Sequence, residues 1–98
     1  MNVGSIGTSA LLAAQQTVHI RANNIVNAQT EGFKPAAPAL VSAQPTGGVA
    51  VFVQEANGPV NLVEEAAGLI TASVQYEAAA TLIRTNDELS KTLLDIAS

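Results

Sequence analysis

The sequence predicts a mainly α fold in which two long helices, one near each end, pair antiparallel in a coiled-coil-like manner. Apolar residues recur at helical spacing near both ends, and four prolines and a glycine pair interrupt the middle. We expect one domain with three parts: an N-terminal helix with its end motif (1–33), a Pro/Gly-rich loop with a short β-hairpin (34–60), and a long C-terminal helix (61–98).

The first helix is predicted to run from Ser5 to about Val26, with Ser5 as its N-cap. Its apolar stripe comprises Ile6, Ala10, Leu11, Ala14, Val18, Ala22 and Ile25. The helix end is marked by Asn23, Asn24, Asn27 and then Gly32, residue types that tolerate left-handed backbone angles. Phe33 could pack back onto the last turn or simply cover the helix end.

The middle segment is interrupted by Pro35, Pro38, Pro45 and Pro59, which exclude a long helix. Its second half, Val49–Val53, is rich in β-branched residues and follows a glycine pair, which favours a strand. We expect a hairpin of Ala39–Gln44 and Val49–Val53 that turns at Pro45–Gly48. Because an isolated hairpin is marginal in water, it should lean on a helix or on another chain.

The helical period returns at Leu62 and holds almost to the end, after a capping-box-like start at Asn61 and Glu64. One stripe repeats every seven residues: Leu62, Leu69, Tyr76 and Ile83. A second stripe on a neighbouring face comprises Leu82, Leu89, Leu93 and Ile96. Gly68 in the helix interior is tolerable if something packs closely against it.

The composition predicts a thin core. Apolar residues make up 48% of the chain, but 18 residues are alanine and only 3% are aromatic. A chain this short buries only about 60–65% of its unfolded surface. The protein is therefore either marginal as a monomer or completes its core with other copies.

The length of the second helix supports association. Residues 62–96 would span about 52 Å as a helix, whereas a compact globule of this size is about 30–35 Å across. The first helix reaches only about 33 Å. An antiparallel pair would leave roughly a third of the second helix without that partner, so its two apolar stripes imply neighbours from other chains.

Catalytic, cofactor and metal sites are not predicted. The chain has no cysteine and one histidine, His19, which argues against thiolate or histidine metal sites and a catalytic triad. The adjacent Glu64 and Glu65 point about 100° apart on a helix, so they do not form an acid/base pair. We therefore expect no enzyme and no cofactor.

Charge and hydropathy bound the remaining partners. A net charge of −4 argues against nucleic acid, and helices without a basic face argue against direct lipid binding. The longest apolar runs, Ala10–Ala14 and Val49–Val53, are far shorter than a membrane span. Residues 1–7 carry no lysine or arginine, so a cleaved secretory signal is not expected.

Two segments resemble the flagellar basal-body rod and hook protein family. Residues 22–34 read Ala-Asn-Asn-Ile-Val-Asn-Ala-Gln-Thr-Glu-Gly-Phe-Lys, similar to the signature that closes the family's N-terminal helix, and residues 9–16 are similar to its lead-in. Segments of residues 60–94 resemble the family's C-terminal helix. The residues that carry the resemblance are Asn23, Asn24, Ile25, Asn27, Thr30, Gly32, Phe33, Leu62, Glu64, Tyr76 and Glu77.

The resemblance implies a structural subunit of the basal-body rod, in the periplasm, whose terminal helices pair as an inner domain. Such subunits stack helically into a hollow rod that transmits torque and passes export substrates. The implied partners are other copies, other rod and hook subunits, and the flagellar type III export apparatus, which uses no cleaved signal. The short middle resembles a proximal-rod type. Arg21, Val74 and Ala79 depart from the residues common in the family.

We expect Ile6 and Leu11 to lie near Leu89–Ile96, and Val18 and Ile25 nearer Val74–Tyr76. The residues assigned to the assembly interface are Ile6, Leu11, Val18, Leu69, Tyr76, Ile83, Leu89, Leu93 and Ile96. A competing interpretation is a small helical adaptor, or binding module, whose apolar seam docks one partner helix.

Overall fold

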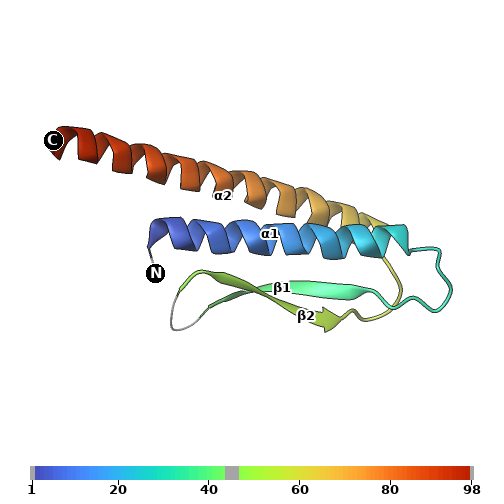
Figure 1. Ribbon diagram of the computed structural model, residues 1–98. Helices are drawn as coiled ribbons and strands as arrows, with labels where there is room; N and C mark the ends of the chain where they lie inside the picture. Colours follow the sequence, from blue (N-terminus) through green and yellow to red (C-terminus); the bar gives the residue numbers. More distant parts are fainter. Residues whose placement is uncertain (1, 44–46, 98) are drawn as a thin grey trace.

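A computed structural model describes residues 2–43 and 47–97 of the chain. The elements follow in the order α1 (Val3–Val26), β1 (Ala36–Ser42), β2 (Val49–Glu55) and α2 (Leu62–Ala97). The helices run antiparallel, and the hairpin lies along α1 (Figure 1). The predicted architecture, two long helices joined by a short hairpin segment, is confirmed.

The molecule is elongated, with principal extents of 63 × 26 × 14 Å. Its radius of gyration is 17.1 Å, whereas a compact globule of this length would have about 13 Å. The difference comes from α2, whose 36 residues reach beyond the other elements (Figure 1). As the length of the second helix predicts, the chain does not form a sphere around one core.

The first helix begins earlier than predicted. Asn2, rather than Ser5, is the N-cap: its Oδ1 accepts a hydrogen bond of 2.8 Å from the Ser5 amide. Asparagine is as good an N-cap as serine, so the helix takes in two more residues. At the other end, Asn27 is the C-cap with φ −98°, and Gly32 adopts the positive φ. Of the residues that mark the predicted helix end, Gly32 is therefore the one that adopts left-handed backbone.

The hairpin is longer at its base than predicted. Its register runs from Ala36 opposite Glu55 to Ser42 opposite Val49. The Ala56 amide donates to the Pro35 carbonyl at 3.0 Å, so by alternation Pro38 falls at a pair that needs no amide hydrogen. Of the predicted turn, residues 45 and 46 lie outside the described residues, and Gly47 and Gly48 both have positive φ.

The helix–helix interface is built from small residues. The buried apolar residues of the described chain are Ala13, Ala14, Ala72 and Ala79. A Cβ at Gly7 would lie 2.9 Å from Ile83 Cγ1, which shows how closely the helices approach. The buried line on α2 is Glu65, Ala72 and Ala79. The predicted heptad line of large residues lies beside it, with Leu62 and Tyr76 exposed, because bulky side chains cannot occupy so narrow a contact.

The predicted helix register is wrong. Gly4 lies against Asn86, and Gly7 against Leu82 and Ile83, so the start of α1 does not reach Leu89–Ile96. Ile25 is displaced too, because Arg21 and Asn24 contact Glu65 in the first turn of α2. Only Val18 lies as expected, sharing a shallow groove with Tyr76.

The hairpin explains the register. It departs beside the end of α1 and returns to the same place, because Ala36 bonds to Asn24 and pairs with Glu55. The first turn of α2 must therefore begin beside the last turns of α1, and its extra length protrudes past Val3 at the other end (Figure 1). We call residues 87–97 of α2 the overhang.

Candidate functional site

Metal-binding clusters and membrane-spanning helices are not found in residues 2–43 and 47–97. Their His, Asp and Glu side chains do not gather in groups of three that could hold a metal ion. Neither described helix has a stretch apolar and long enough to cross a bilayer. The features with functional potential are a buried polar junction among three elements and the uncovered apolar surface of α2.

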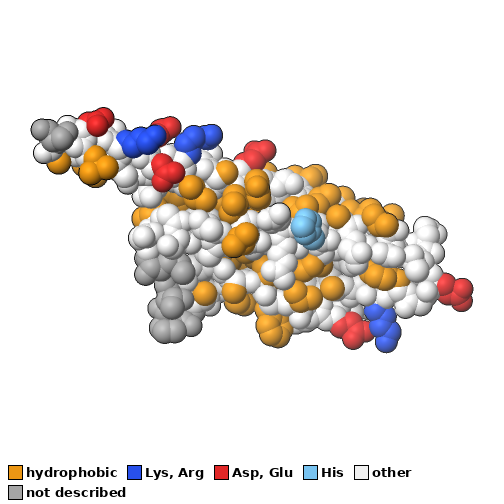
Figure 2. All heavy atoms as spheres, viewed as in Figure 1, with side chains coloured by type: hydrophobic (Ala, Val, Ile, Leu, Met, Phe, Trp, Pro, Cys, Tyr) orange, Lys and Arg blue, Asp and Glu red, His pale blue; other side chains and the backbone are white. Residues whose placement is uncertain are grey.

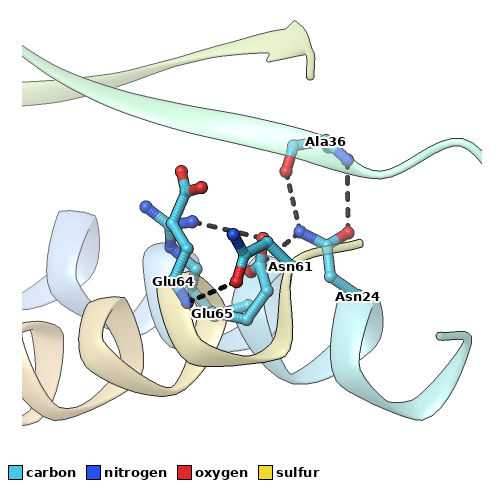
Figure 3. A network of polar contacts seen from close by, with 6 residues as sticks. Asn24, Ala36, Asn61, Glu64 and Glu65 are labelled. Atoms are coloured by element: carbon cyan, nitrogen blue, oxygen red, sulfur yellow. Dashed lines mark hydrogen bonds and ion pairs between the residues drawn. The ribbon is translucent and has the colours of Figure 1, made fainter. Parts of the chain in front are cut away.

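The polar junction is centred on Asn24, which is completely buried. Its Nδ2 donates to the Ala36 carbonyl at 2.8 Å and to Glu65 Oε2 at 3.0 Å, and its Oδ1 accepts from the Ala36 amide at 3.2 Å (Figure 3). The side-chain amide thus pairs with the Ala36 peptide as a neighbouring strand would. One residue joins α1 to both the hairpin and α2.

Glu65 completes the junction through its other oxygen. Its Oε1 accepts from Arg21 Nη1 at 3.3 Å, and the two side chains are only 6% and 17% exposed. Arg21 passes directly over Gly68, where a Cβ would lie 2.5 Å from Nε. The expectation that something packs closely against Gly68 is therefore confirmed. Arg21, which replaces a residue that is usually apolar in the family that the sequence resembles, forms a buried ion pair with Glu65.

Sequence reasoning missed Glu65 and selected its neighbour Glu64. The predicted cap is present, because Asn61 Oδ1 accepts from the Glu64 amide at 3.1 Å, but Glu64 itself is exposed. The signal that could have identified Glu65 is its spacing of three residues from Gly68 on the same helix face, together with an arginine at an otherwise apolar position of α1.

The end motif of α1 forms a chain of local hydrogen bonds. Asn27 Nδ2 donates to the Asn23 carbonyl at 2.9 Å, Thr30 Oγ1 donates to Asn27 Oδ1 at 3.2 Å, and the Phe33 amide donates to the Thr30 carbonyl at 3.2 Å. Half-buried Phe33 lines a shallow groove with Ile20. These residues set the turn that delivers β1 to Asn24.

A second tether holds the far end of the hairpin, where the Val49 amide donates to Ser9 Oγ at 3.0 Å. The hairpin, α1 and α2 then enclose a mainly apolar groove lined by Ala10, Ala13, Ala14, Leu40, Val49, Gln75, Ala78, Ala79 and Leu82. The expectation that the hairpin leans on a helix is confirmed.

The residues assigned to the assembly interface do not form one patch. Five of them are half-buried along the helix pair: Ile6, Leu11, Val18, Leu69 and Ile83. Tyr76 is exposed at the edge of the pair. Leu89, Leu93 and Ile96 lie on the overhang and are 59%, 65% and 76% exposed. Figure 2 shows hydrophobic side chains on the lower side of the overhang and most of its charged side chains along the upper edge.

Two comparisons with known families match the two helices. The family described as flagella basal body rod protein matches residues 5–34. The family described as flagellar basal body rod FlgEFG protein C-terminal matches residues 59–96. Together the two matches cover about two thirds of the chain. The C-terminal family model matches the C-terminal helix. The chain belongs to the flagellar basal body rod family. Among curated proteins no match was found.

As a member of the rod family, the protein is a structural rod or hook subunit of the flagellar basal body, and it assembles with other rod or hook subunits. The matched ranges contain Asn24, the end motif, Glu65 and the overhang up to Ile96, whereas both strands lie between them. Of the other departures from the family pattern, Ala79 is buried in the helix–helix contact and Val74 is exposed.

Proposed function

We propose that this rod-family chain associates with copies of itself and with other rod and hook subunits to build a hollow helical axial structure. In that structure it transmits torque and allows export substrates to pass. The observation that carries the proposal is the overhang, which presents four large apolar side chains to solvent, Leu89, Leu93, Leu94 and Ile96. The buried hydrophobic core of the described chain consists of four alanines.

Hydrophobic burial supplies the driving force for this assembly. Apolar surface removed from water contributes roughly 25 cal/mol per Å². The described chain leaves large apolar side chains uncovered on both faces of the hairpin and along α2, including Phe52, Ile70 and Leu93. A contact between unlike surfaces of successive copies generates a helical filament when its rotation does not close a ring.

The location and export route are inferred from the family, and the expected lack of catalysis and of nucleic-acid or lipid binding from the composition and charge. The subunit reaches the periplasmic rod through the flagellar type III export apparatus, without a cleaved signal. It acts as one domain, is not an enzyme, and binds neither nucleic acid nor lipid directly. The short segment between the helices makes it most similar to a proximal-rod type.

Sedimentation combined with amide exchange tests this proposal. We expect a monomer at low micromolar concentration whose overhang amides exchange freely and become protected when the protein polymerises. A chain that remains a fully protected monomer or dimer at every concentration, and gains protection only on adding one partner helix, would instead be an adaptor module and would overturn the proposal.

A further inference from the structure

The structure leaves two apolar stripes of α2 uncovered. The overhang stripe consists of Leu82, Leu89, Leu93 and Ile96, of which the last three lie beyond the start of α1. The outward stripe consists of Val63, Ile70 and Val74, and Ile70 is 67% exposed. At 100° per residue, the outward stripe is centred opposite Ala72, the residue buried against α1. Nothing in the described chain can reach it.

The overhang stripe continues a contact that the chain already makes. Leu82 lines the groove that α2 forms with Leu40 and Val49 of the hairpin, and Leu89 and Leu93 extend the same side of the helix by two more turns. Inside the chain this side of α2 packs on apolar residues. Beyond Val3 the described residues of α1 and the hairpin do not cover this side of α2, and a second molecule can supply an equivalent surface.

The two stripes have the same spacing. Val63, Ile70 and Val74 are separated by seven and then four residues, and so are Leu82, Leu89 and Leu93. Side chains at seven-plus-four spacing on two parallel helices face each other level by level, as in a coiled-coil seam. The stripes are offset by 19 residues, or about 28 Å along the helix.

Charge favours the same contact. The charged residues of α2 from Arg84 onward, namely Arg84, Asp87, Glu88, Lys91 and Asp95, lie on the side of α2 away from the overhang stripe. The outward stripe is flanked by Ala66, Ala67 and Ala78, and Glu77 lies at its C-terminal edge. At the Ile70–Leu89 and Val74–Leu93 levels the contact therefore buries apolar side chains only, whereas Glu77 lies one turn beyond Val74, at the level of Ile96.

We propose that the overhang stripe of one copy docks in parallel on the outward stripe of a second copy, displaced by about 28 Å, with Ile70 beside Leu89 and Val74 beside Leu93. The inference rests on the proposed self-assembly and assigns its surfaces. Because the two stripes differ, each added copy leaves one of each free, and the contact propagates.

Cysteine cross-linking tests the contact directly, since the chain contains no cysteine. Ile70→Cys and Leu89→Cys are introduced into separate full-length chains, mixed and mildly oxidised. We expect a disulfide-linked dimer in the mixture and at least about tenfold less in either variant alone. Lys91→Cys is the matched control for Leu89→Cys, because it lies at nearly the same height on the charged side of the overhang, and it should not cross-link to Ile70→Cys.

Three results would overturn the inference: no dimer at any protein concentration, equal cross-linking of Ile70→Cys to itself, or preferential cross-linking of Leu89→Cys to Phe52→Cys on the hairpin. The last would place the overhang on the outer face of the hairpin. Rods that assemble without the Ile70–Leu89 cross-link would refute this contact while leaving the proposed function intact. A specific dimer that never extends to a rod would support the contact and refute the function.

Discussion

Gly68 and Arg21 act as a pair at the scale of single residues. The missing Cβ of Gly68 is what allows the guanidinium of Arg21 to cross α2 and reach Glu65. Glycine in a helix interior is normally about 1 kcal/mol less stable than alanine, so its presence here reflects the space that Arg21 occupies.

This pairing predicts that the effect of Gly68→Ala on the free energy of unfolding changes sign when Arg21 is removed. Gly68→Ala should destabilise the protein by about 1–3 kcal/mol, because Arg21 must move and leave the buried Glu65 carboxylate without its cation. In an Arg21→Ala background the same substitution should stabilise by up to about 1 kcal/mol, because only the helix propensity remains. Urea unfolding of the four variants measures both effects. The same sign in both backgrounds would contradict the packing described here.

Gly7 makes a parallel prediction at the other end of the helix pair. Gly7→Ala places a Cβ 2.9 Å from Ile83 Cγ1 and should destabilise by about 1–3 kcal/mol. Combining it with Ile83→Ala relieves the clash, so the two substitutions together should be less destabilising than the sum of their separate effects. Thermal unfolding of a double-mutant cycle measures this coupling, and strict additivity would show that the helices do not meet at this point.

At the scale of elements, the hairpin is held by side chains of α1 rather than by a sheet. Asn24 binds both backbone groups of Ala36, and Ser9 accepts from Val49. A two-stranded sheet is marginal alone, so these tethers decide whether it stays on the helix.

Asn24→Ala should therefore release the base of the hairpin. It leaves the amide and carbonyl of Ala36 and one oxygen of Glu65 without their partner, and we expect a loss of about 2–3 kcal/mol. Amide exchange should accelerate in Ala36–Ser42 and Val49–Glu55 more than in the middle of α2. Asn23→Ala is the matched control: its side chain is exposed and accepts only from Asn27, so hairpin exchange should be unchanged. Equal acceleration of hairpin amide exchange in both variants would show that Asn24 does not hold the base of the hairpin.

The sequence predicts the elements well and their partners poorly. Periodicity and proline placement predict two helices and a hairpin, because these depend on local chemistry. Which helix face is buried depends on how closely the partner approaches, and hydrophobicity alone favours the line through Leu69 over the alanine line through Ala72. Asn24 is not distinguishable by sequence from an exposed polar residue, and Glu65 only through its spacing from Gly68 and the unusual Arg21. The burial of both side chains is decided by where the hairpin returns the chain.

At the scale of the whole molecule, the overhang is a feature that contributes to assembly but not to the folding of the single chain. Its length follows from the sequence, because α2 is much longer than α1. The position of the overhang does not follow from the sequence. The hairpin leaves the end of α1 and returns the chain to the same place, and this pairs α1 with the N-terminal two thirds of α2.

A substitution in the overhang should therefore affect polymerisation much more than the stability of the monomer. Leu93→Asp should change the stability of the monomer by less than about 0.5 kcal/mol, because the side chain is 65% exposed, yet it should abolish polymerisation. Lys91→Asp puts the same group on the opposite side of the overhang and should leave polymerisation intact. Melting curves and sedimentation measure the two effects, and a Leu93→Asp protein that still polymerises would contradict the role of the overhang.

The most direct test of the central claim is electron cryomicroscopy of the polymerised protein. We predict a helical assembly with a central channel, in which each overhang is covered by a neighbouring copy. A closed dimer, or a filament without a channel in which residues 87–97 remain uncovered, would contradict it.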